Sequence, residues 1–214
     1  MWQWLNSGSL VLVVMSFVMS LQSCSDTEVL QNPDYSQAIQ LRKGNFWVYD
    51  FATTDLLSGN RKYHQDDSIF VAKDTIIGNS VYFIVENLYG LHEIKREMSG
   101  MIVGVDGAVE FSATNFVDTL FKNADLGLYG IMAKEEAKIT VPAGSFSTVC
   151  FILLQRNRSG HHNQADSNNP SVYNREFSVV KRVWYARNIG IVKSAQYFGN
   201  VAGSERELKR YYIQ

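Results

Sequence analysis

The sequence has few of the residues that would tie it to a particular chemistry. It contains only two cysteines, Cys24 and Cys150, too few for a disulfide framework. The motifs of phosphate-binding loops, dinucleotide-binding folds, serine hydrolases and redox dithiols are all missing. With 20 basic and 21 acidic residues, the chain has no basic field that would attract nucleic acid. We therefore predict no nucleic-acid partner, no cofactor, and no catalytic or metal-binding residue, and we favour a protein that is not an enzyme.

The first 24 residues lack Asp, Glu, Lys and Arg altogether. Within them, residues 10–21 (LVLVVMSFVMSL) form an almost unbroken apolar run. A membrane-spanning helix needs about 20 apolar residues, so this run has the length of a signal-peptide core instead. The preceding residues, MWQWLNSGS, depart from the usual signal-peptide pattern because they carry no basic side chain. We predict a signal peptide over residues 1–23, or a start codon elsewhere.

The stretch Leu21-Gln22-Ser23-Cys24 resembles a bacterial lipobox, in which the cysteine receives lipid and the leader is removed before it. Several acyl chains on one residue anchor a protein stably, because each buried CH₂ contributes about 0.8 kcal/mol. We predict lipid attachment at Cys24 and a membrane partner through that anchor. The alternatives are a secreted protein with an incidental cysteine, an uncleaved N-terminal anchor, or a disulfide between Cys24 and Cys150. With Cys24 lipidated, Cys150 is expected to be a small buried apolar residue.

The rest of the chain is predicted to hold one domain behind a tether. Residues 24–40 supply the lipidated cysteine and a polar tether, and residues 41–214 form a single β-rich domain. Helix signals are weak, with at most one turn over residues 33–43. A polar stretch at 156–174 is expected to be a long exposed loop, and residues 116–136 are ambiguous.

Alternation of apolar and polar residues dominates the domain. Strand patterns occur in pairs, each pair separated by residues that favour tight turns: Gly78-Asn79, Asp106-Gly107, Pro142-Ala143-Gly144 and Arg187-Asn188. Asp106-Gly107 is a candidate for a type I′ turn, and Gly144 is expected in the left-handed region. Residues 46–51 and 207–213 add a first and a last strand. The predicted fold is mainly β, either a single curved antiparallel sheet or an open or partly closed β-barrel, with little helix.

Three stretches together carry a family resemblance: GNFWVYDF at 44–51, ITVPAGSFSTVCFILLQ at 139–155 and VWYARNIGIVKSAQYF at 183–198. They resemble exported lipoproteins of the Bacteroidota that are similar to the domain of unknown function DUF3108. Ser145 stands where threonine is commoner in that group, and residues 187–189 depart from its usual small residue, Gly and Val. The resemblance implies a curved antiparallel β fold in the cell envelope, on an outer-membrane lipoprotein facing the periplasm or the cell surface. It implies no reaction.

Histidines and acidic pairs are the remaining candidates for chemistry. His161 and His162, with Asp166, lack the spacing of a known metal site and read as solvated loop residues. His64 and His92 are isolated and are expected on strand surfaces. The pairs Asp66-Asp67 and Glu135-Glu136 could in principle bind calcium or transfer protons, but such pairs in turns are usually solvated.

The aromatic residues have two interpretations. A curved sheet bearing Trp47, Tyr49, Phe51, Tyr82, Trp184 and Tyr185 could line a groove for a ligand, although filling the core is the simpler role. The sequence favours a lipid-anchored binding or accessory module whose small-molecule, glycan or protein ligand is unspecified. The alternatives are a carrier of an apolar ligand in a β-cavity and a hydrolase acting on envelope glycans.

Overall fold

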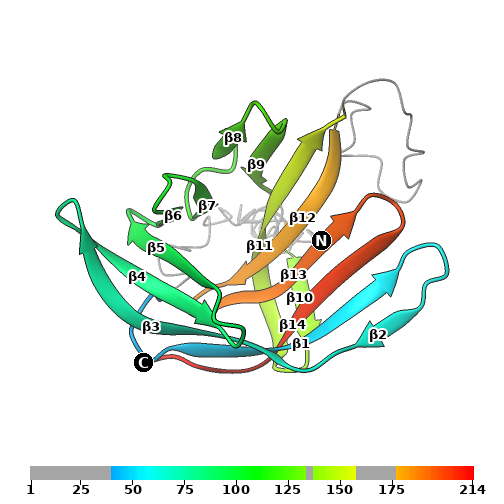
Figure 1. The fold of residues 1–214 in the computed structure, drawn as a ribbon, viewed down its shortest axis with the longest axis horizontal. Helices are drawn as coiled ribbons and strands as arrows, with labels where there is room; N and C mark the ends of the chain where they lie inside the picture. Colours follow the sequence, from blue (N-terminus) through cyan, green and yellow to red (C-terminus); the bar gives the residue numbers. More distant parts are fainter. Residues whose placement is uncertain (1–39, 134–136, 158–176) are drawn as a thin grey trace, which may run out of the picture. The chain divides into compact units, whose positions relative to one another are not determined.

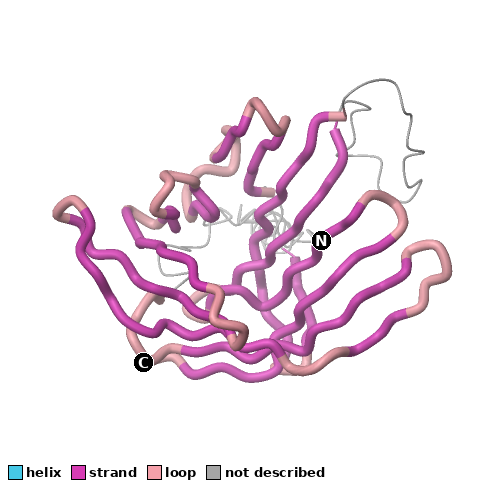
Figure 2. Tube along the Cα trace, viewed as in Figure 1, coloured by secondary structure: helices cyan, strands magenta, loops and turns pink. Residues whose placement is uncertain are grey.

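The computed structural model describes residues 40–133, 137–157 and 177–214 of the chain. Throughout these ranges the regular structure is β-strand, with no helix (Figure 2). The fourteen strands are β1 (Phe46–Asp55), β2 (Arg61–Tyr63), β3 (Asp67–Ile77), β4 (Ser80–Asn87), β5 (His92–Met98), β6 (Met101–Gly104), β7 (Val109–Ser112), β8 (Phe121–Asn123), β9 (Leu128–Met132), β10 (Ala137–Val141), β11 (Gly144–Arg156), β12 (Phe177–Ala186), β13 (Gly190–Phe198) and β14 (Ala202–Tyr212). The predicted fold class is confirmed, and the ambiguous stretch at 116–136 contributes β8 and β9.

The strands form one antiparallel sheet in the order β7-β6-β5-β4-β3-β1-β14-β13-β12-β11-β9-β8 (Figure 1). Short strands extend it, since β2 pairs with β1 and β10 pairs with β11. Neighbours in the sheet are neighbours in sequence except around β1, which lies between β3 and β14, and at β9, which pairs with β11. The first and the last strand thus join two consecutive runs of hairpins into one sheet.

Strong curvature brings the two ends of this sheet near each other. The Phe111 ring of β7 packs on the Tyr185 ring of β12, with centroids 4.7 Å apart. The Tyr185 hydroxyl donates to the carbonyl of Glu110, also on β7. Strand β7 also lies close to β9 without pairing with it in the described residues. The sheet is therefore a nearly closed barrel with an unsealed seam, and its concave side forms an interior.

The turns show how local residues set the strand pairing. Gly78 and Asn79 have φ values of 53° and 65°, the pattern of a type I′ turn, and they join Ile77 to Ser80. The predicted type I′ turn at Asp106-Gly107 is wrong, because among its two residues only Gly107 has positive φ, at 83°. The Gly107 N–H donates to the Gly104 carbonyl, which closes a different tight turn, and the β6–β7 ladder shifts register further on, between Ile102 and Val103.

The predicted turn at Pro142-Ala143 is confirmed between β10 and β11. Gly144 does not take the expected left-handed conformation. Its φ of 136° is nevertheless open to few residues other than glycine. The Ala143 N–H donates to the Leu208 carbonyl, which ties this turn to the last strand.

Aromatic and aliphatic side chains fill one part of the interior. Trp47, Tyr49, Tyr185 and Leu208 are all buried in the same cluster, which confirms that these three aromatic residues belong to the core. Each such side chain contributes about 1.5–3 kcal/mol on burial. The full set of buried residues in the cluster is Leu41, Trp47, Tyr49, Val71, Val85, Ile102, Phe111, Ala113, Met132, Val141, Val149, Phe151, Val183, Tyr185, Ala186, Val192 and Leu208.

Several predictions lie outside the described residues. These are the signal peptide at 1–23, the lipid site at Cys24, most of the tether and helical turn before residue 40, and nearly all of the loop at 156–174. The single domain over 41–214 stays a prediction. In the described ranges, no helix is long and apolar enough to cross a membrane.

Candidate functional site

Strand β5 places a row of charged residues on the inner face of the sheet. Glu93, Lys95 and Glu97 alternate along the strand and therefore share one face. Glu93 lies opposite Val85, a buried core residue, and side chains of paired residues project to the same side. This row thus lies on the concave face, where the Lys95 side chain is largely buried while Glu93 and Glu97 stay exposed to solvent.

Lys95 is the centre of a triad of charges on this face. Its Nζ atom lies 2.5 Å from an Oε2 atom of Glu93 and 2.6 Å from Oε2 of Glu110 on β7. Burial by itself would lower the pKa of Lys95, but the two carboxylates outweigh it, so the pKa is raised. For Glu93 burial acts to raise the pKa, and the positive charges of Lys95, Lys181 and Arg206 lower it overall. Lys95 therefore stays protonated and Glu93 stays ionised.

A second ion pair, between Asp67 on β3 and Arg206 on β14, lies on the same face of the sheet. Asp67, the first residue of β3, has a side chain only 3% exposed, and its Oδ2 atom lies 2.7 Å from Nε of Arg206. The Arg206 side chain is 41% exposed, and its guanidinium carbon lies 6.0 Å from the centre of the Phe51 ring. The Oδ1 atom of Asp67 is buried and has no hydrogen-bond partner within the described residues. A buried carboxylate with one free oxygen is uncommon outside functional or hydrated sites.

Lys181 on β12 faces the same interior and has no ion-pair partner in the part of the chain that the structure describes. It alternates with Val183, a core residue, and so points inward. Among the described residues it forms no ion pair, and it is exposed to solvent. Desolvation by the surrounding protein lowers its pKa, as does the charge of Lys95, against the opposing pull of Glu110 and Glu93. Its charge therefore belongs to the same electrostatic group as the triad.

These observations define the interior cluster: Asp67, Glu93, Lys95, Glu110, Lys181 and Arg206. Its members come from β3, β5, β7, β12 and β14 and carry three positive and three negative formal charges. Strands far apart in the sequence meet here because the sheet curves. The cluster can hold a polar ligand by ion pairs and hydrogen bonds, and solvent reaches several of its members.

Two tyrosines form the floor of the interior cluster. The Tyr49 hydroxyl donates to the Ile191 carbonyl at 3.0 Å, and the Tyr185 hydroxyl donates to the Glu110 carbonyl at 3.3 Å. Both side chains are buried, and burial raises the pKa of each well above its ordinary value. Because both hydroxyls stay protonated and already donate, neither suits the role of a general base.

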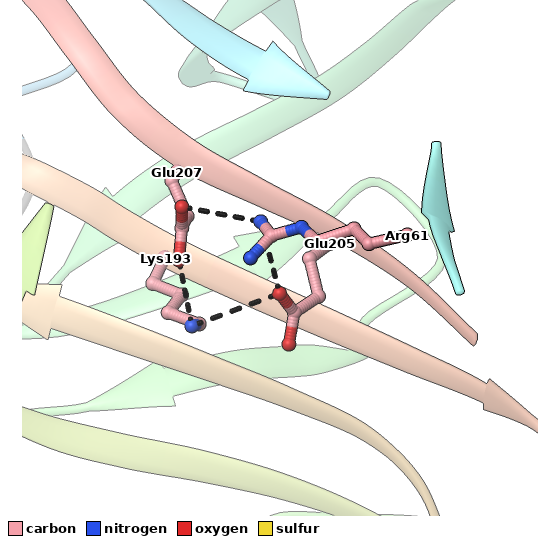
Figure 3. A network of polar contacts seen from close by, with 4 residues as sticks. All are labelled: Arg61, Lys193, Glu205 and Glu207. Carbon is pink, nitrogen blue, oxygen red and sulfur yellow. Dashed lines mark hydrogen bonds and ion pairs between the residues drawn. The ribbon is translucent and has the colours of Figure 1, made fainter. Parts of the chain in front are cut away.

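A separate network of charges stabilises the sheet on another face. Arg61 contacts Glu205 and Glu207 at 3.2 Å each, and Lys193 contacts Glu207 at 2.8 Å and Glu205 at 3.8 Å (Figure 3). Both glutamates alternate along β14 with Arg206, so they project from its opposite side. Every charge in this network has a partner of opposite sign. We therefore assign the network a structural role.

A small cleft lies at the end of the charged row on β5. Gln40, Leu41, Arg42 and Glu97 line it, and its volume is about 180 Å³. Burial raises the pKa of Glu97, and the charge of Arg42 opposes that shift. The volume is below the 300 Å³ or so of ordinary small-molecule sites, so this cleft is a weaker candidate than the interior cluster.

The residues singled out from the sequence have mixed outcomes. His64 and His92 are exposed, as predicted. Asp66 is exposed and contacts Lys209, but the expectation that Asp67 is solvated is wrong, because β3 begins there and turns it inward. His161, His162, Asp166, Glu135 and Glu136 lie outside the described residues. Within the described ranges, no group of three His, Cys, Asp or Glu side chains could hold a metal ion.

The buried state predicted for Cys150 is confirmed. The thiol is free in the structure and lies on β11 among apolar neighbours. Burial raises the pKa of Cys150 to about 11, so little thiolate is present at neutral pH. Its reactivity is therefore low, in keeping with a packing role.

The interior cluster was not predicted, although faint signals exist. One signal is Lys181, which interrupts the largely apolar strand Phe-Ser-Val-Val-Lys-Arg-Val-Trp-Tyr. The other is the alternation of Glu93, Lys95 and Glu97 on a strand that pairs with one rich in core residues. Charged residues that alternate on a strand ordinarily face solvent. The sequence does not reveal that this face is the concave one.

Comparisons with known proteins find similar solved structures but no matching family model or curated protein. Among solved structures, the chain is similar to a protein assigned as exported, with a YmcC-like fold, from Bacteroides fragilis. The identity is 14%, the TM-score is 0.43, and the match covers 80% of this chain and 96% of that one. It is also similar to a protein assigned as a lipoprotein from Parabacteroides distasonis, with 17% identity, a TM-score of 0.44, and coverage of 84% and 100%. No inference about function follows from likeness at this level.

Proposed function

We propose that this protein is a ligand-binding accessory module of the cell envelope, anchored by lipid at Cys24, which binds a polar ligand on the concave face of its sheet. The interior cluster is the observation that carries this proposal. Six charged residues from five strands share the concave face, where Lys95 and Asp67 are largely buried and Glu93, Lys181 and Arg206 are open to solvent.

The cluster is open enough to meet a ligand. The Glu93 side chain is 67% exposed, and Lys181 is exposed as well, although both project from the inner face. A group of charges that is partly open to solvent on a concave face suits a ligand that is orientated by a few polar contacts.

The two alternative functions have less support. An apolar cargo would meet ionised groups such as Lys95 and Glu93, and desolvating these is costly. A glycan hydrolase of the usual kind needs one carboxylic acid with a raised pKa beside an ionised one. Lys95 lies between Glu93 and Glu110 and lowers the pKa of Glu93, which is the opposite of what a general acid requires. The raised pKa of Glu97 belongs to the small cleft at the end of the row, whose only other charged lining residue in the described part of the chain is Arg42, so no second carboxylate lies there.

The envelope location rests on the sequence. The apolar run at 10–21 and the lipobox ending at Cys24 support export and lipidation. We propose an outer-membrane lipoprotein, on the periplasmic side or the cell surface, of the DUF3108-like kind found in the Bacteroidota. Mass spectrometry of the membrane form should find an acylated N-terminal Cys24, and Cys24→Ala should release the protein from the membrane. A mature protein that begins elsewhere would refute the anchor.

Ligand binding is tested on protein purified from its own membrane. Native mass spectrometry should show a bound small molecule that leaves when the protein unfolds. Hydrogen exchange with and without that molecule should show protection concentrated in β5, β12 and β14. Protection confined to β2 and β13, which carry Arg61 and Lys193 of the separate network, or a native mass equal to that of the chain alone, would count against the proposal.

A further inference from the structure

We infer that the interior cluster is an oxyanion-binding site, in which Lys181 and Arg206 together hold a carboxylate or phosphate group of the ligand. This inference rests on the proposed function and names the chemistry of what is bound. It follows from which charges in the cluster are already satisfied and which are available.

The negative charges of the cluster are committed to other residues. Glu93 and Glu110 both contact Nζ of Lys95, and Asp67 contacts Nε of Arg206. Among the described residues of the cluster, the one buried carboxylate oxygen without a hydrogen-bond partner is Oδ1 of Asp67, and because it is buried a cation could reach it only by displacing Arg206. The cluster is therefore poorly suited to bind a second cation.

The positive charges are only partly committed. Lys181 has no ion-pair partner among the described residues, so its three N–H donors are available. Arg206 uses Nε toward Asp67, and neither of its Nη groups donates to a described residue. One guanidinium edge and one ammonium group thus remain for a ligand.

Arg206 is held in position for this role. The Asp67 carboxylate lies at one edge of the guanidinium, and the Phe51 ring lies 6.0 Å from its central carbon. The Phe51 ring in turn contacts the ring of His64, with centroids 5.3 Å apart. A guanidinium fixed in this way presents two parallel N–H groups, the geometry that matches a carboxylate or phosphate. Little conformational entropy is then lost on binding.

The two cations lie on the same face of the sheet, near enough to interact. The charge of Arg206 helps to lower the pKa of Lys181, and the charges of both residues help to lower the pKa of Glu93. Their strands are separated by β13 alone, and Arg206 pairs with Ser194 while Lys181 pairs with Gln196, two residues further along. Their long side chains can therefore converge on one group. Bringing an anion between them would relieve the repulsion between the two cations.

Calorimetric titration tests the inference on the full chain. The probes are glucuronate, which carries a carboxylate, glucose 1-phosphate, and glucose as the neutral control. At least one anion should bind saturably, about tenfold or more tightly than glucose, and the arm that binds identifies the group. Raising the salt concentration should weaken the binding.

Variants locate the binding. Lys181→Glu should abolish anion binding, and Lys181→Gln should weaken it about tenfold, without loss of folding because the native lysine is unpaired. Arg206→Lys keeps the charge beside Asp67 but removes the planar fork, so it should weaken binding to a similar degree. Lys73→Gln, an exposed lysine on β3, is the matched control and should bind as the wild type does. Circular dichroism confirms that each variant is folded.

Three results would overturn the inference. Glucose could bind as tightly as both anions, Lys181→Glu could bind the anion normally, or neither anion could give saturable heat up to about 10 mM, a concentration well above an ordinary weak affinity. In each case a neutral molecule found in the native protein would leave the proposed binding function standing. The two proposals can thus fail separately.

Discussion

Replacing Arg206 by glutamine should destabilise the protein far more than replacing its partner Asp67 by asparagine. The two ends of this ion pair differ in burial, since the Asp67 side chain is 3% exposed and the Arg206 side chain is 41% exposed. Arg206→Gln leaves a carboxylate buried without a counter-charge, which typically costs 3–5 kcal/mol. Because water can partly enter through the exposed end of Arg206, we expect the lower limit, about 3 kcal/mol.

Asp67→Asn leaves a guanidinium whose Nε atom is buried but whose side chain is 41% exposed, so water still reaches part of it and we expect a loss of about 1 kcal/mol. The double variant should be about as stable as Asp67→Asn alone, because it contains no unpaired charge. Urea unfolding followed by tryptophan fluorescence measures these differences. Arg206→Gln should also lower Tm by about 6–12 °C. Lys209→Gln, which removes a surface charge from the same strand, is the control and should change little. Equal losses for both single variants, or a larger loss for Asp67→Asn, would refute the reasoning.

Three further predictions concern packing, reactivity and pH. Gly130→Ala should lower the free energy of unfolding by about 1–3 kcal/mol, because the new Cβ atom would lie 2.7 Å from Cζ of Phe151. In urea unfolding, adding Phe151→Leu should restore much of this loss. A double variant that is no more stable than Gly130→Ala would show that the clash is not the cause. Burial raises the pKa of Cys150 to about 11, so Cys150 should react with iodoacetamide at pH 8 only after the protein unfolds. Peptide mass spectrometry measures the labelling. Fast labelling of the folded protein would contradict the burial of this thiol. Burial acts to raise the pKa of Glu207, but hydrogen bonding to Lys193 and the charges around it lower the pKa overall. The pair therefore stabilises the folded state above the ordinary glutamate pKa, and this stabilisation is lost as the pH falls through the lowered value. The stability difference between wild type and Glu207→Gln should accordingly shrink in acid, and a difference that grows there would refute the assignment.

The fold could be predicted from the sequence because its determinants are local. Gly78-Asn79 and Pro142-Ala143 set turns through their own backbone preferences, and the strands beside them alternate as the pleat requires. The failure at Asp106-Gly107 has the same local origin, since other tight turns, in which only the glycine has positive φ, use similar residues. Strand pairing between neighbours in sequence then follows without long-range information.

The interior cluster could not be predicted, because it depends on curvature. Lys181 and Glu93 belong to strands on opposite sides of β1, and nothing in either segment encodes their proximity. On a flat sheet the same alternation would place both residues in solvent. The burial of Asp67 could not be predicted for a related reason. An acidic pair before a strand resembles a turn, whereas the inward direction of the Asp67 side chain is set by the pairing of Asp67 with Tyr49.

The pairing of β1 with β14 makes the last eleven residues of regular structure decisive for how this chain folds. Every other strand pair can form between segments close in sequence, but this one must close a loop of most of the domain. Such non-local closure slows folding, because chain entropy is lost before the contacts form. A chain that stops before Ala202 would hold two half-sheets, each with an unpaired edge open to other molecules. The domain therefore cannot complete itself from its N-terminus onward during synthesis, and it can reach its final topology only once the whole chain is available.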